Sequence, residues 1–308
     1  MTSKKKLLLV GVVIAALLLL SGCSSDPTTY TKPIVGFGVE DIFVYPMAGI
    51  MWAIGKSIAF GNYAVVIILA TIVVRTMAWP IYAKTNDMSL KMQLVQPEAD
   101  KIRLKYEGKE DEASKQRMQM ETMQLYKKYG IGLGGCLLPF IQMPIFIGFY
   151  RTISRMPATI LDGEGNLLTS GHWLRVFTDT KLFGVDLLLG QTDDPLQKWG
   201  VIVLGILVGL TQILSIFLTQ KRQKNIKKEQ TSNVPAYRLQ QQQSTQKQTQ
   251  TTMNIMMYFM AGMMVLFVLR SPAGLGLYWL VGNIYSTFQS YIGHKTSDKR
   301  LNKLKEKH

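Results

Sequence analysis

Residues 58–82 read "IAFGNYAVVIILATIVVRTMAWPIY", an apolar run about as long as a membrane-spanning helix, and its one charged side chain is Arg75. A charge near the middle of such a helix costs about 2.5–3.5 kcal/mol on insertion scales, so another interaction must offset it. Two explanations are open. Arg75 precedes Lys84 by nine residues, and its side chain could extend to the lipid headgroups. Alternatively, it could stay hydrated among neighbouring helices.

The rest of the chain repeats this apolar pattern. It has 308 residues, of which 47% are hydrophobic, and a formal net charge of +15. A basic balance often indicates nucleic-acid binding, but long apolar runs favour a membrane protein whose charges lie in loops. Further runs occupy roughly Ile131–Ile153, Trp199–Leu218, Met253–Leu269 and Leu275–Gly293. The sequence therefore predicts an all-α protein whose core, residues 58–293, is a bundle of five transmembrane helices.

The N-terminal residues predict a targeting signal. Lysines at 4–6 precede an apolar stretch at 7–20, and small residues then lead to Cys23 in "LSGC". This order is typical of a lipoprotein signal peptide, so we expect residues 1–22 to be cleaved and Cys23 to carry lipid. The alternative is an ordinary secretory signal with a chance cysteine.

Charge predicts the orientation of the spans. If the N-terminus lies outside, residues 83–130, 220–252 and the tail 294–308 are cytoplasmic, and they hold ten, seven and six lysines and arginines. The outer loop 154–198 holds four, against six acidic residues. This distribution follows the positive-inside rule. We therefore expect a multi-pass protein of the plasma membrane, with a lipid-anchored N-terminus outside and the C-terminus in the cytoplasm.

The segments beside the spans have expected roles of their own. Residues 23–38 read as an extracellular tether and 39–57 as an interfacial amphipathic helix. Residues 83–130 carry helix-forming residues on both sides of "YEGKED", which predicts a cytoplasmic helical hairpin. Its methionines could pack the hairpin or contact varied clients. The basic tail 294–308 would attract either anionic lipid or ribosomal RNA.

Residue types that carry most enzyme chemistry are missing from the expected spans. The three histidines, His172, His294 and His308, lie outside them, and the spans hold no carboxylate. "GKS" at 55–57 lacks the first glycine of a phosphate-binding loop. No enzymatic activity, cofactor or metal is therefore expected.

Other polar residues within the spans favour the hydrated explanation for Arg75. They are Thr71, Gln142, Thr211, Gln212, Asn283 and Gln289. Helices that surround such groups could form a hydrophilic substrate groove, in which a positive charge attracts an acidic segment of a client protein. Burial of the client's apolar residues, at about 0.8 kcal/mol per CH₂, would then drive insertion without fuel.

Three motifs carry a resemblance. They are "RTMAWPIYAKTNDMSLKMQLVQPEADKIRLKY", "GGCLLPFIQMPIFIGFYRTI" and "PAGLGLYWLVGNIYSTFQSYI". In this order they closely resemble the YidC/Oxa/Alb insertase family, specifically the five-span lipoprotein form of Gram-positive bacteria. One departure is "YGIGLGGC" at 129–136, where many members have Asn-Pro.

The resemblance implies a function. Arg75 would be the central arginine of the groove, Gln142 would belong to the second-span motif, and Trp279 and Asn283 to the fifth-span motif. Such proteins insert nascent membrane proteins into the lipid bilayer and help them fold, alone or with the Sec translocon, and a ribosome is a further expected partner.

Two other classes stay open at this point. A solute channel or anion transporter could use Arg75 to bind its solute, although the sequence shows no internal repeat of the kind many transporters have. A passive lipoprotein assembly factor would bind finished subunits and would not need the helical hairpin.

Overall fold

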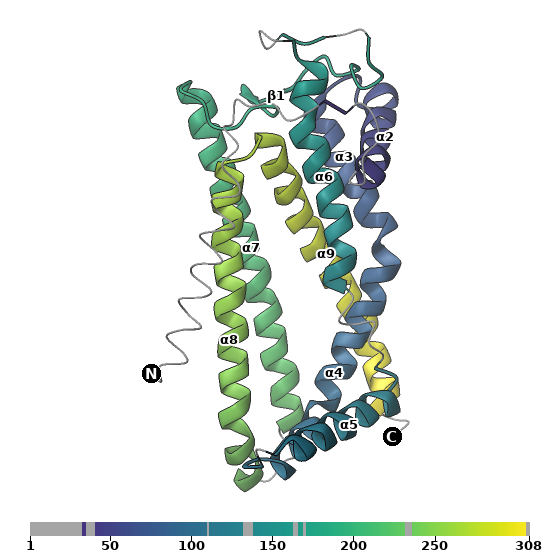
Figure 1. Cartoon of the computed structure of the whole chain (residues 1–308), viewed down its shortest axis with the longest axis vertical. Coiled ribbons are helices and arrows are strands. Elements are labelled where there is room, and N and C mark those ends of the chain that lie inside the picture. Colours follow the sequence, from purple (N-terminus) through teal and green to yellow (C-terminus); the bar gives the residue numbers. More distant parts are fainter. Residues whose placement is uncertain are drawn as a thin grey trace.

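The computed structural model describes residues 33–34, 41–109, 111–131, 138–162, 166–168, 171–231 and 236–305. The expected signal peptide and Cys23 lie outside these ranges. The described part of the chain is mostly helical, in agreement with the expected all-α class (Figure 1).

Eight helices and one short hairpin make up this part of the chain. The helices are α2 (Asp41–Ser57), α3 (Tyr63–Met77), α4 (Trp79–Lys105), α5 (Glu112–Lys128), α6 (Leu138–Ile160), α7 (Pro195–Thr231), α8 (Ala236–Leu269) and α9 (Ala273–Lys305). Two strands, β1 (Lys181–Leu182) and β2 (Val185–Asp186), pair antiparallel, with Lys181 opposite Asp186.

Helix α9 is the centre of the arrangement, because it packs against α3, α4, α6, α7 and α8. Helices α7 and α8 run side by side along most of the molecule, while α2 packs on α3 and α6 (Figure 1). Helix α5 lies across the end opposite β1. We call these two ends the α5 end and the β1 end.

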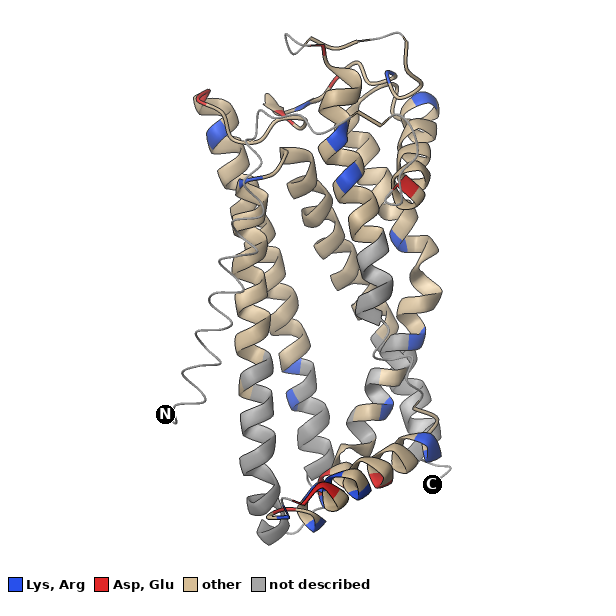
Figure 2. Ribbon diagram, in the orientation of Figure 1, with Lys and Arg blue, Asp and Glu red and all other residues tan. Residues whose placement is uncertain are grey.

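Helix α7 has the character of a membrane span. Within the described ranges, its Pro195–Lys221 portion is the one helix that is both long and apolar enough to cross a bilayer. Tyr63–Met77 and Asn254–Leu269 are apolar but shorter. Charged residues gather at the two ends of the molecule, and the ribbon between them is largely uncharged where it is described (Figure 2). This segregation is typical of a membrane protein.

The run that includes Arg75 is divided into three parts. Residues 58–62 form a turn, and Asn62 then caps α3 by accepting a hydrogen bond from the backbone N–H of Val65 (3.0 Å). Helix α3 ends at Met77, and α4 begins at Trp79. Pro80 lies in the first turn of α4, where its missing N–H costs nothing.

Several helices extend into segments that the sequence predicted as loops or tail. Helix α6 continues to Ile160, α7 and α8 cover most of 220–252, and α9 reaches Lys305. Lysine, glutamine and glutamate are good helix formers, and extending an existing helix avoids the cost of nucleation. The change from apolar to polar residues therefore did not predict where these helices end.

Close packing near the β1 end joins α2 to the bundle. Val44, Ala48 and Met51 form one fully buried stripe of α2, as expected for a helix with one apolar face. On α6, a Cβ added at Gly148 would lie 2.8 Å from the backbone oxygen of Phe43. The absence of a side chain there lets the two helices approach closely.

Candidate functional site

Arg75 lies at the contact between α3 and α9. It is half-buried in the last turn of α3, and its Nη1 donates a hydrogen bond to Ser286 Oγ at 2.5 Å. The Tyr278 side chain is near enough to interact electrostatically with the guanidinium. A Cβ on Gly282 would lie 2.9 Å from Arg75 Nη2, so glycine leaves room for the guanidinium. These three α9 residues are four apart and share one helical face.

Among the described residues, the surroundings of Arg75 leave its charge unneutralised. In the part of the chain that the structure describes, no carboxylate forms an ion pair with Arg75. The Ser286 hydroxyl satisfies a donor without cancelling the charge. The position in the last turn of α3 favours a cation, since the helix dipole is negative there. The hydrogen bond and the dipole therefore offset part of the insertion cost, and no described carboxylate cancels the positive charge.

A second polar contact joins the same helices. Thr76 Oγ1 donates to the Ile72 carbonyl at 2.7 Å and lies 2.8 Å from the Tyr285 hydroxyl. Because the threonine proton is used within α3, the tyrosine is the donor. The Trp79 ring meets the Tyr285 ring edge-on, with centroids 6.2 Å apart. The end of α3 is thus held to α9 by hydroxyl and aromatic groups.

Three of the predicted site residues face neighbours other than Arg75. Thr71 is fully buried, and its hydroxyl donates to the Ile67 carbonyl at 2.6 Å. Asn283 Nδ2 lies 3.4 Å from Thr211 Oγ1 and so turns toward α7. Trp279 is buried and stacks on Phe146, with centroids 5.8 Å apart. The structure does not gather these side chains around the guanidinium.

The remaining predicted residues lie on three helices. Gln212 is half-buried on α7, while Gln142 belongs to α6 with its side chain outside the described set. Gln289 is buried on α9, three residues after Ser286, and its Nε2 has no hydrogen-bond partner among the described residues. Cys23 is not described.

Sequence reasoning missed the actual neighbours of Arg75. Tyr278, Gly282 and Ser286 repeat at intervals of four residues along "YWLVGNIYS". That spacing places a hydroxyl, a gap and a second hydroxyl on one face of a helix. This four-residue spacing could have identified the neighbours from the sequence, whereas the amide side chains within the spans pointed to Asn283 and Gln289.

Comparison with known proteins identifies the family of this chain. The model of the family described as 60Kd inner membrane protein matches residues 55–300. The chain belongs to this family. The family predicted from the three motifs is thereby confirmed.

Similar proteins come from Gram-positive bacteria. The chain is 31% identical over 291 residues to "Membrane protein insertase YidC 2" of Listeria innocua, covering 94% of this chain and 83% of that protein. It is 32% identical over 289 residues to "Membrane protein insertase MisCA" of Bacillus subtilis, covering 93% and 88%. It is 32% identical over 295 residues to "Membrane protein insertase YidC" of Oceanobacillus iheyensis, covering 95% and 97%.

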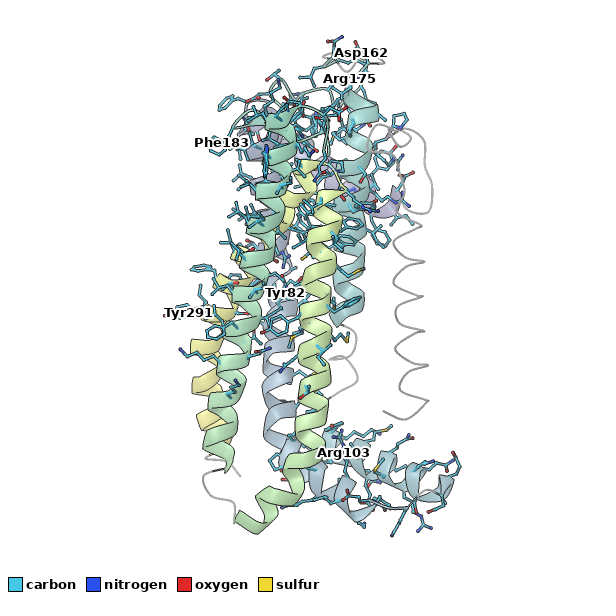
Figure 3. The ribbon with its side chains drawn as sticks, turned by 90° about the vertical axis from the view of Figure 1, so that its left-hand side faces the viewer. Tyr82, Arg103, Asp162, Arg175, Phe183 and Tyr291 are labelled. Carbon is cyan, nitrogen blue, oxygen red and sulfur yellow. The ribbon has the colours of Figure 1, made fainter. Side chains whose placement is uncertain are left out.

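In this member of the 60Kd inner membrane protein family, α4 and α5 pack antiparallel across a turn. Lys105 Nζ donates to Glu121 Oε1 at 2.7 Å, and Tyr129 donates to Glu98 at 2.6 Å. Figure 3 places Arg103, on α4, at the opposite end from Asp162 and Arg175. The hydrogen bond from Lys105 holds the pKa of Glu121 below its ordinary value, and the same bond raises the pKa of Lys105.

A second charged centre lies between α2 and α6, near the β1 end. Arg155 Nη1 donates to Asp41 Oδ1, and Nη2 donates to the Pro33 carbonyl at 2.8 Å. Both charged side chains are buried. Next to them, the backbone N–H of Ile34 donates to Thr159 Oγ1 at 2.9 Å. This network ties residues 33–34 and the start of α2 to α6.

Proposed function

We propose that the chain is a membrane protein insertase and chaperone that inserts nascent membrane proteins and helps them fold. The names of its relatives, all membrane protein insertases, support this function. The proposed topology has five spans, formed by α3 with the first turns of α4, by α6 and α7, and by the apolar parts of α8 and α9. The α5 end then faces the cytoplasm, and the β1 end faces outward.

The observation that carries the mechanism is that Arg75 has no ion-pair partner among the described residues. It is held by a hydroxyl group and no described carboxylate pairs with it, so its field extends to any polypeptide that passes α3 and α9. In our proposal a hydrophilic groove around Arg75 admits an acidic outer segment of the client. Coulombic attraction draws that segment partway across, and burial of the client's apolar span in lipid supplies the free energy.

Other parts of the proposal concern partners and anchoring. The α4–α5 pair is the cytoplasmic hairpin that meets clients, and its exposed Met120 and Met123 give it adaptable apolar surface. We propose the Sec translocon as a second partner and the basic tail as a ribosome contact. Lipid on Cys23 would anchor the mature N-terminus outside.

The test compares three variants reconstituted in lipid vesicles. Arg75→Ala removes the charge, Arg75→Lys keeps it without the planar fork, and Ser286→Ala removes the hydroxyl partner while the charge stays. The client has one span and an acidic outer segment, and its matched control has the acids replaced by amides. Insertion is measured by protection of the outer segment from added protease.

Arg75→Ala should lose insertion of the acidic client and keep insertion of the amide control. Arg75→Lys and Ser286→Ala should retain much of the activity, because attraction to a groove charge does not need bidentate geometry. Equal insertion of the acidic client by Arg75→Ala and the wild type would contradict the proposal. Solute flux through client-free vesicles would favour the transporter class.

A further inference from the structure

Two phenylalanines near the β1 end have an unusual backbone and unusual exposure. Phe60 has φ of 47° and Phe183 has φ of 50°, and they are the non-glycine residues with positive φ in the described ranges. Phe60 is 87% exposed and Phe183 94% exposed. Figure 3 shows Phe183 projecting from the side of the molecule. Glycine would fit such positions without strain, so an exposed aromatic ring there costs free energy without a visible packing gain.

The strand hairpin fixes the height of Phe183 along α7. A Cβ on Gly184 would lie 2.8 Å from Leu196 Cδ2, so the tip rests on the first turn of α7. The Gln197 side chain accepts a hydrogen bond from the N–H of Asp186 at 2.7 Å and donates to the carbonyl of the same residue at 2.9 Å. Phe183 is therefore level with the first turn of the apolar portion of α7, which begins at Pro195.

The exposed side of α7 continues from this point. Leu196, Trp199, Val203 and Ile206 are all exposed large hydrophobic residues. Their spacing of three or four residues places them in one stripe along a helix. Because α7 is apolar enough to span a bilayer, this stripe is the surface that lipid would cover. Phe183 extends the stripe beyond the helix.

Charged residues beside the tip match a membrane interface. Lys181 is exposed two residues before Phe183, and Lys198 is exposed next to Trp199. Aromatic rings are enriched at headgroup level, and lysine beside them reaches the lipid phosphates while its stem stays in the apolar layer. Asp193 and Asp194 are exposed just before the apolar portion, where water would meet them.

The turn that carries Phe60 is joined by hydrogen bonds to the segment before β1. Asn62 Nδ2 donates to Asp179 Oδ2 at 2.7 Å, and the backbone N–H of Tyr63 donates to the Asp179 carbonyl at 2.8 Å. Asp179 lies two residues before β1. Hydrogen bonds thus join the turn that carries Phe60 to the segment just before β1.

We propose that Phe183, with Phe60 as a second contact, inserts into the headgroup–acyl boundary of the leaflet at the β1 end. In the proposed topology this is the outer leaflet. The occupant of the exposed surface is phospholipid, because the tip continues the apolar stripe of α7 and is flanked by lysines. The inference does not depend on the insertase function.

The test places a nitroxide at one added cysteine of the full chain in phosphatidylglycerol–phosphatidylethanolamine vesicles. The background is Cys136→Ser and keeps Cys23, the proposed lipid-bearing residue. The sites are Phe183→Cys, Asp193→Cys as the aqueous reference and Val203→Cys as the lipid reference. The background without an added cysteine measures labelling elsewhere. Collision rates with oxygen and with a water-soluble nickel complex give the depth of each site. Site 183 should be oxygen-accessible and nickel-protected, closer to site 203 than to site 193.

Two results would overturn the proposal. Nickel access at site 183 equal to that at site 193 would place the tip in water. Protection from both reagents would mean that protein covers it, as a second copy of the chain could. Since the label alters the tip, Phe183→Trp gives an independent measurement. Its added emission over the wild type should be quenched by lipids brominated near the top of the acyl chain, and absence of quenching contradicts the inference.

Discussion

The buried pair of Asp41 and Arg155 gives a prediction with a definite magnitude. Their side chains are only 6% and 7% exposed. Removing one partner of such a pair costs about 3–5 kcal/mol, because a charge is left buried without its counter-ion. At about 1.4 kcal/mol per tenfold change, Asp41→Leu should raise the equilibrium constant for opening of α2 by roughly a hundred- to several-thousand-fold.

The two single variants should differ in size. Arg155→Met leaves a carboxylate in the first turn of α2, where the helix dipole stabilises a negative charge by about 0.3–1 kcal/mol. That carboxylate can also take up a proton, whereas the guanidinium left by Asp41→Leu cannot lose one. Arg155→Met should therefore destabilise less. The double variant should recover most of the loss, since no buried charge remains.

Amide hydrogen exchange of α2 in lipid vesicles measures this cycle, and Arg75→Met is a matched control for loss of an arginine from another helix. The control should leave exchange in α2 near the wild-type rate. The reasoning is refuted if Asp41→Leu exchanges like the wild type, or if the double variant is as unstable as Asp41→Leu alone.

Two further predictions concern packing and pH. Gly148→Ala should destabilise the α2–α6 contact by about 1–3 kcal/mol, because its Cβ would meet the Phe43 carbonyl at 2.8 Å; unchanged thermal stability contradicts this. The Lys105–Glu121 pair should stabilise the α4–α5 contact between about pH 4.5 and 10.5, the ordinary pKa values of its members. The pKa of Glu121 is lowered in the folded protein, so this stabilisation is lost as pH falls through the folded pKa of Glu121. The pKa of Lys105 is raised, so the stabilisation is also lost as pH rises through the folded pKa of Lys105. The excess amide exchange of Glu121→Gln over the wild type in α5 should therefore vanish in acid; a constant excess would show that the pair is not its cause.

Local features of the chain were the most predictable. The family motifs, the apolar run of α7 and the helix-forming residues around 106–111 are each readable within a few dozen residues, because helix propensity and span length are local properties. The signal at Asn62 is also local, since an amide side chain before an apolar run caps a helix. Because Asn62 lies within an apolar run, the start of a helix at this residue was not predicted.

Long-range contacts could not be read in this way. Asp41 and Arg155 are 114 residues apart, and neither residue stands out in its own segment. The turn around Phe60 depends on hydrogen bonds to residues 178–179. Arg75 itself was singled out by its cost in an apolar run, but its partner Ser286 lies 211 residues away. Small hydroxyl residues in a span give a weak signal until the helix that faces them is known.

The central claim is that the positive charge of Arg75 attracts the client, and a charge-swap experiment tests it most directly. Wild type and Arg75→Glu are each reconstituted with two clients that differ only in an acidic or a basic outer segment. The rate of insertion is measured for all four pairs. The account predicts that the acidic client is favoured by the wild type and the basic client by Arg75→Glu. If both proteins rank the two clients in the same order, the charge of Arg75 does not select them.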